Sequence, residues 1–197
     1  MKVSTQYLMI ENPGVCDPKC FTLIGASMAD TCVDPSKEPY LIGKFGSGTK
    51  NSIALLLREN LNPKVFVSNL KLSFSVEKET LKDALSSKDC DIICVEYSGK
   101  TDDGKNKSGR EKFSYTTDFG KHIWDDPCLA LREFVSNAID FSIRQFGNWD
   151  DVVIKPVDES QVRAKNGYTR VFVPINQSVY NFYLNLGRWF LHFSEPE

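Results

Sequence analysis

The alternation of apolar and polar residues predicts a series of short β-strands along the chain. Residues 3–10, which read Val-Ser-Thr-Gln-Tyr-Leu-Met-Ile, form the first of them and run into a turn at residues 11–14. The same mixture of β-branched and aromatic residues predicts further strands at 65–67, 70–76, 91–97, 112–117, 152–157 and 168–173. The charged, glycine-containing segment 98–110 is expected to be the exposed tip of a hairpin.

A helical spacing of apolar residues predicts three helices, at 49–59, at 127–146 and over 179–190. The second has the clearest boundaries, because Asp126 supplies an N-cap carboxylate, Pro127 suits the first helical position and Gly147 favours a stop. Residues 21–25 are expected to form a short helix or turn. Residues 26–40, with two prolines and several small side chains, are expected to form a mobile loop.

Strands and helices follow one another with no internal repeat and no low-complexity linker, which favours a single α+β domain of 197 residues. Hydrophobic residues make up 41% of the chain and charged residues 25%, which is enough apolar material for a sizeable core. The longest apolar run, residues 53–57, is far shorter than the roughly 20 residues that span a bilayer. The N-terminus has no apolar signal core, so we expect a cytoplasmic protein without a membrane partner.

Charge and cysteine content narrow the classes of ligand. The 24 basic and 26 acidic residues leave a net charge of −2, so no overall field draws the chain onto a polyanion, and nucleic acid is not expected as the primary ligand. The six cysteines include no CxxC pair. Cys16, Cys20 and Cys32 would need His122 or His192 to complete a zinc site, so reduced, buried thiols are preferred to a metal centre.

Three side chains with oxygen atoms fall on one stripe of the predicted helix 127–146. Glu133, Asn137 and Asp140 are spaced i, i+4 and i+7, so they project from the same side of the helix. Two carboxylates and a carboxamide in this arrangement can hold a hard cation and position a water molecule. On its own, the same stripe is also compatible with an ordinary solvated helix face.

A glycine-rich segment leads directly into the predicted helix 49–59. Residues 43–50 read Gly-Lys-Phe-Gly-Ser-Gly-Thr-Lys. Glycines let the backbone approach an anion closely, and a helix N-terminus offers free N–H groups and a positive dipole to a phosphate. The segment matches neither the Walker A loop nor the dinucleotide-binding fingerprint, so alone it is weak evidence for phosphate binding.

Together, these segments resemble the GHKL ATPases, the Bergerat-fold superfamily of DNA gyrase B subunits, MutL proteins, heat-shock chaperones and histidine kinases. The run Glu133-x3-Asn137-Ala-x-Asp140 resembles the N-box of that superfamily, and residues 42–48 resemble its G-box in the chaperone-like spelling. Residues 10–27 are similar to the strand that ends in Asp-x-Gly-x-Gly and the short helix that leads into the ATP lid. The resemblance implies a two-layer α/β sandwich of Bergerat type, with a mixed sheet covered by helices on one face.

Two departures from the family pattern are visible. Here the G-box precedes the N-box, which is the pattern of a circular permutation, and compact domains tolerate permutation when the ancestral termini lie close together. Where the family carries its adenine-reading aspartate, this chain offers Glu11 or Asn12, with Gly14 the only glycine. Either side chain can accept a hydrogen bond from an exocyclic amine.

The resemblance also implies a role for each matched position. Glu133 would act as the general base for hydrolysis, Asn137 would coordinate Mg²⁺, and Asp140 would support the metal's water shell or the hydrogen bonds of the site. The phosphates would be bound by the glycine-rich segment, at Gly43, Phe45, Gly46, Ser47, Gly48, Thr49 and Lys50.

The implied function is Mg²⁺-dependent binding and slow hydrolysis of ATP, with lid closure coupled to a protein partner or an attached domain. Two alternative functions stay open: a non-catalytic nucleotide-sensing or interaction module on the same fold, and another phosphate-ligand enzyme on an unrelated fold. A homo-oligomer is compatible with each of these functions. The expected parts of this single domain are an adenine-motif strand and turn (1–25), a lid (26–41), the G-box and its helix (42–59), a β-rich region (64–120), the N-box helix (127–146), and C-terminal strands and a helix (150–197).

Overall fold

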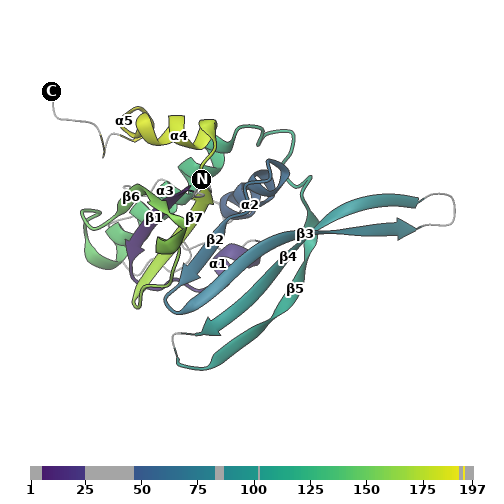
Figure 1. Cartoon of the computed structure of the whole chain (residues 1–197), viewed down its shortest axis with the longest axis horizontal. Coiled ribbons are helices and arrows are strands. Elements are labelled where there is room, and N and C mark those ends of the chain that lie inside the picture. Colours follow the sequence, from purple (N-terminus) through teal and green to yellow (C-terminus); the bar gives the residue numbers. More distant parts are fainter. Residues whose placement is uncertain (1–5, 25–46, 83–86, 102, 191–192, 194–197) are drawn as a thin grey trace.

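The computed structural model describes residues 6–24, 47–82, 87–101, 103–190 and 193. Its strands form one seven-stranded sheet in the order β5-β4-β3-β2-β7-β1-β6 (Figure 1). Each strand pairs with its neighbours in the antiparallel sense. The strands are β1 (Gln6–Pro13), β2 (Lys64–Val67), β3 (Leu70–Lys82), β4 (Ser87–Lys100), β5 (Asn106–Thr116), β6 (Val153–Asp158) and β7 (Tyr168–Pro174).

The α-helices pack on one face of this sheet, around a common apolar core. The long helices α2 and α3 contact each other, and α3 also lies against β1 (Figure 1). This arrangement confirms the α+β fold class and is consistent with two layers. The helices are α1 (Lys19–Thr22), α2 (Gly48–Arg58), α3 (Pro127–Phe146), α4 (Gln177–Leu184) and α5 (Leu186–Trp189), with the 3-10 helix η3 at Glu159–Gln161. None of the helices in the described part of the chain combines the length and apolarity of a membrane span.

The expectation of a mixed sheet is wrong for the described strands. β6 and β7 run parallel to each other, but β1 lies between them and is antiparallel to both. On the other side, β2, β3, β4 and β5 follow one another as antiparallel neighbours. β1 therefore separates β6 and β7, which would otherwise be parallel neighbours.

Side-chain alternation along β1 fixes which residues face the helices. Leu8 and Ile10 are buried in the main core beneath α2 and α3. Tyr7 and Met9 point to the opposite face, where they join a smaller apolar cluster that contains Phe172. Successive residues of a strand point to opposite faces, so the side chains of Glu11 and Asn12 must also lie on opposite faces of the sheet.

The helix boundaries follow the capping signals closely. α3 covers residues 127–146 as predicted, the Asp126 carboxylate accepts a hydrogen bond from the Cys128 N–H, and Gly147 adopts the left-handed conformation at φ +81°. The C-terminal helix is in fact two short helices, α4 and α5, which meet at Asn185. Asn185 ends α4, and its side-chain amide donates to the Asn181 carbonyl, which satisfies a backbone group at the helix end.

The strands β1, β3, β4 and β5 extend beyond the predicted limits. β3 and β4 continue as a two-stranded arm that projects from the domain in Figure 1, with pairs such as Lys78 opposite Asp91 and Thr80 opposite Asp89. Polar and charged residues predominate along this arm, so the period-two pattern that marks a half-buried strand is weak there. The hairpin tip between β4 and β5 is correspondingly shorter than the predicted segment 98–110.

Gly14→Ala is expected to destabilise the fold, because Gly14 lies just after β1 with a φ of +88° and packs against α3. A Cβ atom at Gly14 would lie 2.4 Å from Cε1 of Phe141. The left-handed backbone costs an L-residue about 1–2 kcal/mol, and overpacking typically adds about 1–3 kcal/mol. Gly147→Ala is the matched control, since φ there is +81° but nothing lies within 4 Å of its Cβ position. Urea denaturation should show the larger loss for Gly14→Ala, and equal losses would contradict the packing against Phe141.

Candidate nucleotide-binding site

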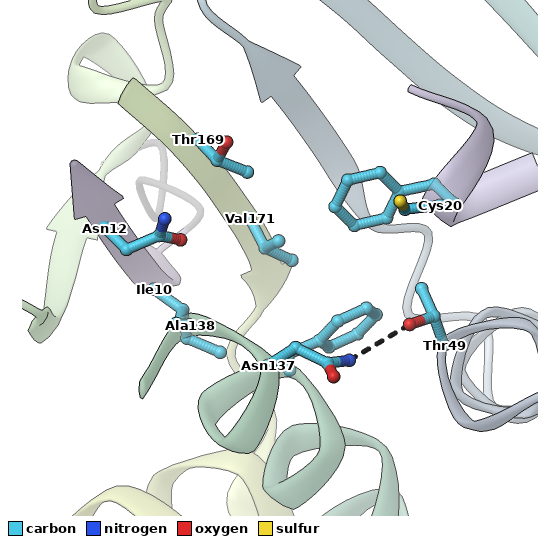
Figure 2. Close-up of a pocket in the computed structure, with 10 residues that line it drawn as sticks. Ile10, Asn12, Cys20, Thr49, Asn137, Ala138, Thr169 and Val171 are labelled. Atoms are coloured by element: carbon cyan, nitrogen blue, oxygen red, sulfur yellow. Dashed lines mark hydrogen bonds between the residues drawn. The ribbon is translucent and has the colours of Figure 1, made fainter. Parts of the chain in front are cut away.

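A pocket lies between the inner face of β1 and β7 and the helices α1, α2 and α3 (Figure 2). Its enclosed part is small, with about 20 Å³ of room for the centre of a water molecule, and the hollow together with its open mouth amounts to about 360 Å³. The lining combines an apolar wall with a few polar groups, as ligand pockets usually do. The lining residues are Ile10, Asn12, Cys20, Phe21, Thr49, Phe134, Asn137, Ala138, Thr169 and Val171.

The register of β1 decides between the two candidate base-reading residues. Asn12 is on the inner face, is 4% exposed and directs its carboxamide into the pocket (Figure 2). Its Nδ2 donates to the Pro13 carbonyl at 2.9 Å, which leaves Oδ1 as the acceptor that a ligand can use. Glu11 is on the outer face, where its carboxylate pairs with Lys165 and Arg170. Of the two, only Asn12 lines the pocket.

Gly14 shapes the pocket indirectly, through Thr169. The Thr169 hydroxyl lines the pocket, donates to the Gly14 carbonyl at 3.0 Å and accepts from the Cys16 N–H at 3.4 Å. The Gly14 N–H donates to the Gly167 carbonyl at 2.8 Å. The segment after β1 is thereby fixed to β7 and to the turn before it, and Gly14 itself lies outside the pocket lining.

The N-box and the end of the G-box meet at the start of α2. Asn137 of α3 donates from Nδ2 to Oγ1 of Thr49 at 3.0 Å (Figure 2) and to Oε1 of Glu133 at 3.2 Å. A Cβ atom at Gly48 would lie 2.1 Å from Oε1 of Glu133, so a larger residue at this position would displace the end of the Glu133 side chain. Ser47, the N-cap position of α2, makes no side-chain capping bond. The sequence places these two motifs far apart, and the fold brings them into contact.

Several sequence-predicted site residues fall outside the described part of the chain. These are Gly43, Phe45 and Gly46 of the glycine-rich segment, together with the predicted lid 26–41 and the third candidate metal thiol, Cys32.

The Glu133 carboxyl lies in an environment that shifts its pKa. The side chain is largely buried, and loss of hydration raises the pKa of its carboxyl above the ordinary value. The hydrogen bond from Asn137 and the charges of Arg132 and Lys50 oppose this rise, whereas the nearby Asp140 carboxylate adds to it. Asp140 itself is 4% exposed and lies outside the pocket lining.

Lys50 is buried rather than directed toward solvent at the mouth of the pocket. It is 1% exposed, and its Nζ donates to the Cys20 carbonyl at 2.8 Å. Burying an ammonium group is costly unless it is hydrogen-bonded, so this contact ties α1 to α2. The contact helps to hold α1, whose Cys20 and Phe21 form one wall of the pocket. That Lys50 also takes part in phosphate binding stays a prediction.

Asn137 offers one carboxamide oxygen, a type of ligand that hard cations such as Mg²⁺ take. Among the described residues, no three His, Cys, Asp or Glu side chains are grouped so as to hold a metal ion. Burial raises the pKa of the Cys16 thiol to about 12, which keeps it protonated and unsuited to ligation. Mg²⁺ often takes few protein ligands and completes its shell with phosphate oxygens and water. Since Nδ2 of Asn137 donates both of its hydrogen bonds, Oδ1 is the oxygen that can serve as such a ligand.

Comparison with known proteins gives no match: no family model, no curated protein and no solved structure corresponds to this chain. Function must therefore be inferred from the chemistry of the pocket itself.

Thr169 is the most informative site residue that no sequence motif indicates. It occupies an inward position of β7, where Val171 and Val173 are the other inward residues. A threonine among buried valines at period-two spacing is a signal that the sequence contains. Assigning it to this pocket, however, requires knowing that β7 lies beside β1.

Proposed function

We propose that this chain binds ATP with Mg²⁺ in the pocket between β1, β7 and α3, and that it hydrolyses the nucleotide slowly. The observation that carries the proposal is the contact of Glu133 and Asn137 with Gly48 and Thr49 at the start of α2. This is the convergence that the resemblance to the GHKL ATPases predicts, in spite of the exchanged order of the two motifs.

The inner part of the pocket suits a purine base. Ile10, Val171 and Ala138 supply apolar surface for a flat ring, and Oδ1 of Asn12 supplies a hydrogen-bond acceptor at its inner end. An exocyclic amine such as that of adenine matches this acceptor, whereas a keto oxygen at the same position would leave both groups unpaired.

The outer part of the pocket suits the phosphates. The first turn of α2 begins at Gly48, and the unpaired N–H groups of a helix N-terminus attract anions. Oδ1 of Asn137 would hold Mg²⁺ beside it. When bound, the metal neutralises phosphate charge, which is the main requirement for phosphoryl transfer.

Glu133 is the group that fits the hydrolytic step. Its carboxylate would accept a proton from the water whose oxygen attacks the terminal phosphorus, while the bond from that phosphorus to the bridging oxygen breaks and ADP departs. The raised pKa makes this carboxylate a stronger base than an exposed one, and its contact with Gly48 at the start of α2 supports a role beside the terminal phosphate.

A nucleotide-sensing module without catalysis is the second candidate. The neutral Asn12 stands where the family carries an aspartate, and a neutral acceptor forms a weaker hydrogen bond than a charged one. Binding would then close a lid and signal to a partner or an attached domain. In this alternative the pocket still binds the nucleotide, but Glu133 has no catalytic role.

The binding proposal is tested by thermal unfolding with ATP, ADP, GTP and a non-hydrolysable ATP analogue, each with and without Mg²⁺. A ligand present at 100 times its dissociation constant should stabilise the fold by about 2.7 kcal/mol. Asn12→Leu, which preserves side-chain volume but removes the acceptor, should abolish the shift with ATP. Phosphate release then separates the two candidates, since the sensing module binds without turnover. A wild-type protein that no nucleotide stabilises would refute both.

A further inference from the structure

A second cleft lies on the opposite face of the sheet, over β1, β6 and β7. It has about 220 Å³ of room for the centres of water molecules, or about 550 Å³ of open space with its mouth included, and the segment between β6 and β7 forms one side of it. Its charged lining residues are Lys155, Arg163, Lys165, Arg170 and Glu11. We propose that this cleft binds the phosphate group of a small phosphorylated ligand, at a site separate from the nucleotide pocket.

The charge balance of the cleft favours an anion. Four cationic side chains face one carboxylate, in a chain whose net charge is −2. Glu11 pairs with Lys165 and Arg170, whereas Lys155 and Arg163 form no ion pair with any residue that the structure describes. Like charges gathered in one concavity repel one another, and a bound anion removes that repulsion.

The cations around Glu11 are held in fixed positions. Nε of Arg170 donates to Glu11, and its Nη1 donates to the Arg163 carbonyl at 2.9 Å. The Lys165 ammonium lies 2.7 Å from Oε1 of Glu11 and 3.4 Å from the centre of the Tyr168 ring. The Arg170 side chain is only 13% exposed. Ordering these groups in advance lowers the entropy that a ligand must otherwise overcome when it binds.

A phosphate fits this set of cations better than a single carboxylate does. The Glu11 carboxylate already pairs with Lys165 and Arg170. The positive charge that remains is better balanced by a ligand with more than one negative charge. A phosphate monoester carries close to two negative charges near neutral pH and offers several acceptor oxygens to Arg and Lys donors. Met9 and Val157 form apolar surface in the same cleft, against which the organic part of such an ester can pack.

The site uses the outward residues of the same strands whose inward residues line the nucleotide pocket. Glu11 and Arg170 face this cleft, whereas their neighbours Asn12 and Thr169 face the other one. The two sites therefore share strands but no side chains. The phosphate proposal stands or falls independently of ATP binding.

The test is isothermal titration calorimetry of the full chain with glycerol phosphate, with inorganic phosphate and with succinate, all at one ionic strength. We expect both phosphate probes to bind more tightly than succinate. Arg163→Gln and Lys155→Gln should each weaken phosphate binding by about tenfold or more, because each removes a charged donor. Both side chains are exposed, so these variants are expected to fold.

Two controls localise the binding. Lys100→Gln and Lys88→Gln each alter an exposed cation on β4, outside both sites, and should leave phosphate affinity unchanged. The proposal is overturned if the Arg163 and Lys155 variants bind phosphate like the wild type, if the Lys100 and Lys88 variants weaken binding as much as they do, or if succinate binds as tightly as phosphate. None of these outcomes would change the results expected from the ATP experiments.

Discussion

Glu133→Gln is expected to lower ATP hydrolysis by about 10²–10⁴-fold, the range that a general base contributes, while ATP binding changes little. Glutamine preserves the size of the side chain and the Oε1 atom that accepts the 3.2 Å hydrogen bond from Asn137. It cannot accept a proton from the attacking water. Steady-state phosphate release gives the first quantity, and thermal stabilisation by a non-hydrolysable ATP analogue gives the second.

Glu59→Gln is the matched control, because Glu59 is an exposed acid that lies just beyond α2 and outside the pocket. It should hydrolyse ATP at the wild-type rate. If Glu133→Gln also does so, the general-base assignment is wrong and the sensing module becomes the better reading. If Glu133→Gln instead loses ATP binding, Glu133 acts in binding rather than in proton transfer.

The same substitution should change how stability depends on pH. Burial raises the pKa of Glu133, so the folded state favours the protonated acid. The stability that this group contributes is fully present below its ordinary pKa and is lost as pH rises through the raised value. Glu133→Gln cannot ionise, so it should gain stability relative to wild type between mildly acidic and neutral buffer. Urea titrations at the two pH values measure this, and a constant difference would argue against the burial of the charge. Wild-type hydrolysis should in turn fall as pH drops through the raised pKa.

Asn137→Ala is expected to abolish most of the Mg²⁺-dependent part of ATP binding, with a loss of about 10- to 100-fold for one contact to a charged group. The alanine removes Oδ1, the proposed metal ligand, and also the 3.0 Å bond to Thr49. That hydrogen bond joins α2 to α3, so a stability loss of about 1 kcal/mol should accompany the change. Titrations with ATP in Mg²⁺ and in EDTA measure the first effect, and urea denaturation measures the second.

Thr49→Val separates the two consequences of removing Asn137. It breaks the same inter-helix hydrogen bond from the other side but retains the Asn137 oxygen. We expect a similar loss of stability with a smaller loss of affinity for ATP. Equal losses of affinity in the two variants would mean that Asn137 acts by positioning α2 and not by binding the metal.

The sequence by itself determined the individual elements wherever a local signal was strong. The limits of α3 follow from Asp126, Pro127 and Gly147, because capping depends only on neighbouring residues. The stripe of Glu133 and Asn137 follows from helical periodicity in the same way. Where the local pattern is weak, the sequence did not predict the element limits. Examples are the arm of β3 and β4 and the break between α4 and α5.

Only the tertiary structure decided which of these groups meet. The order of the strands places Asn12 in the pocket and Glu11 in the cleft behind it, because a single residue of register reverses the face to which a strand side chain points. The burial of Lys50 against α1 and the contact of Glu133 with Gly48 depend in the same way on how separate elements pack. Periodicity specifies which side of an element is buried, but contacts between residues far apart in sequence arise from the packing of the whole chain, so no local pattern contains them.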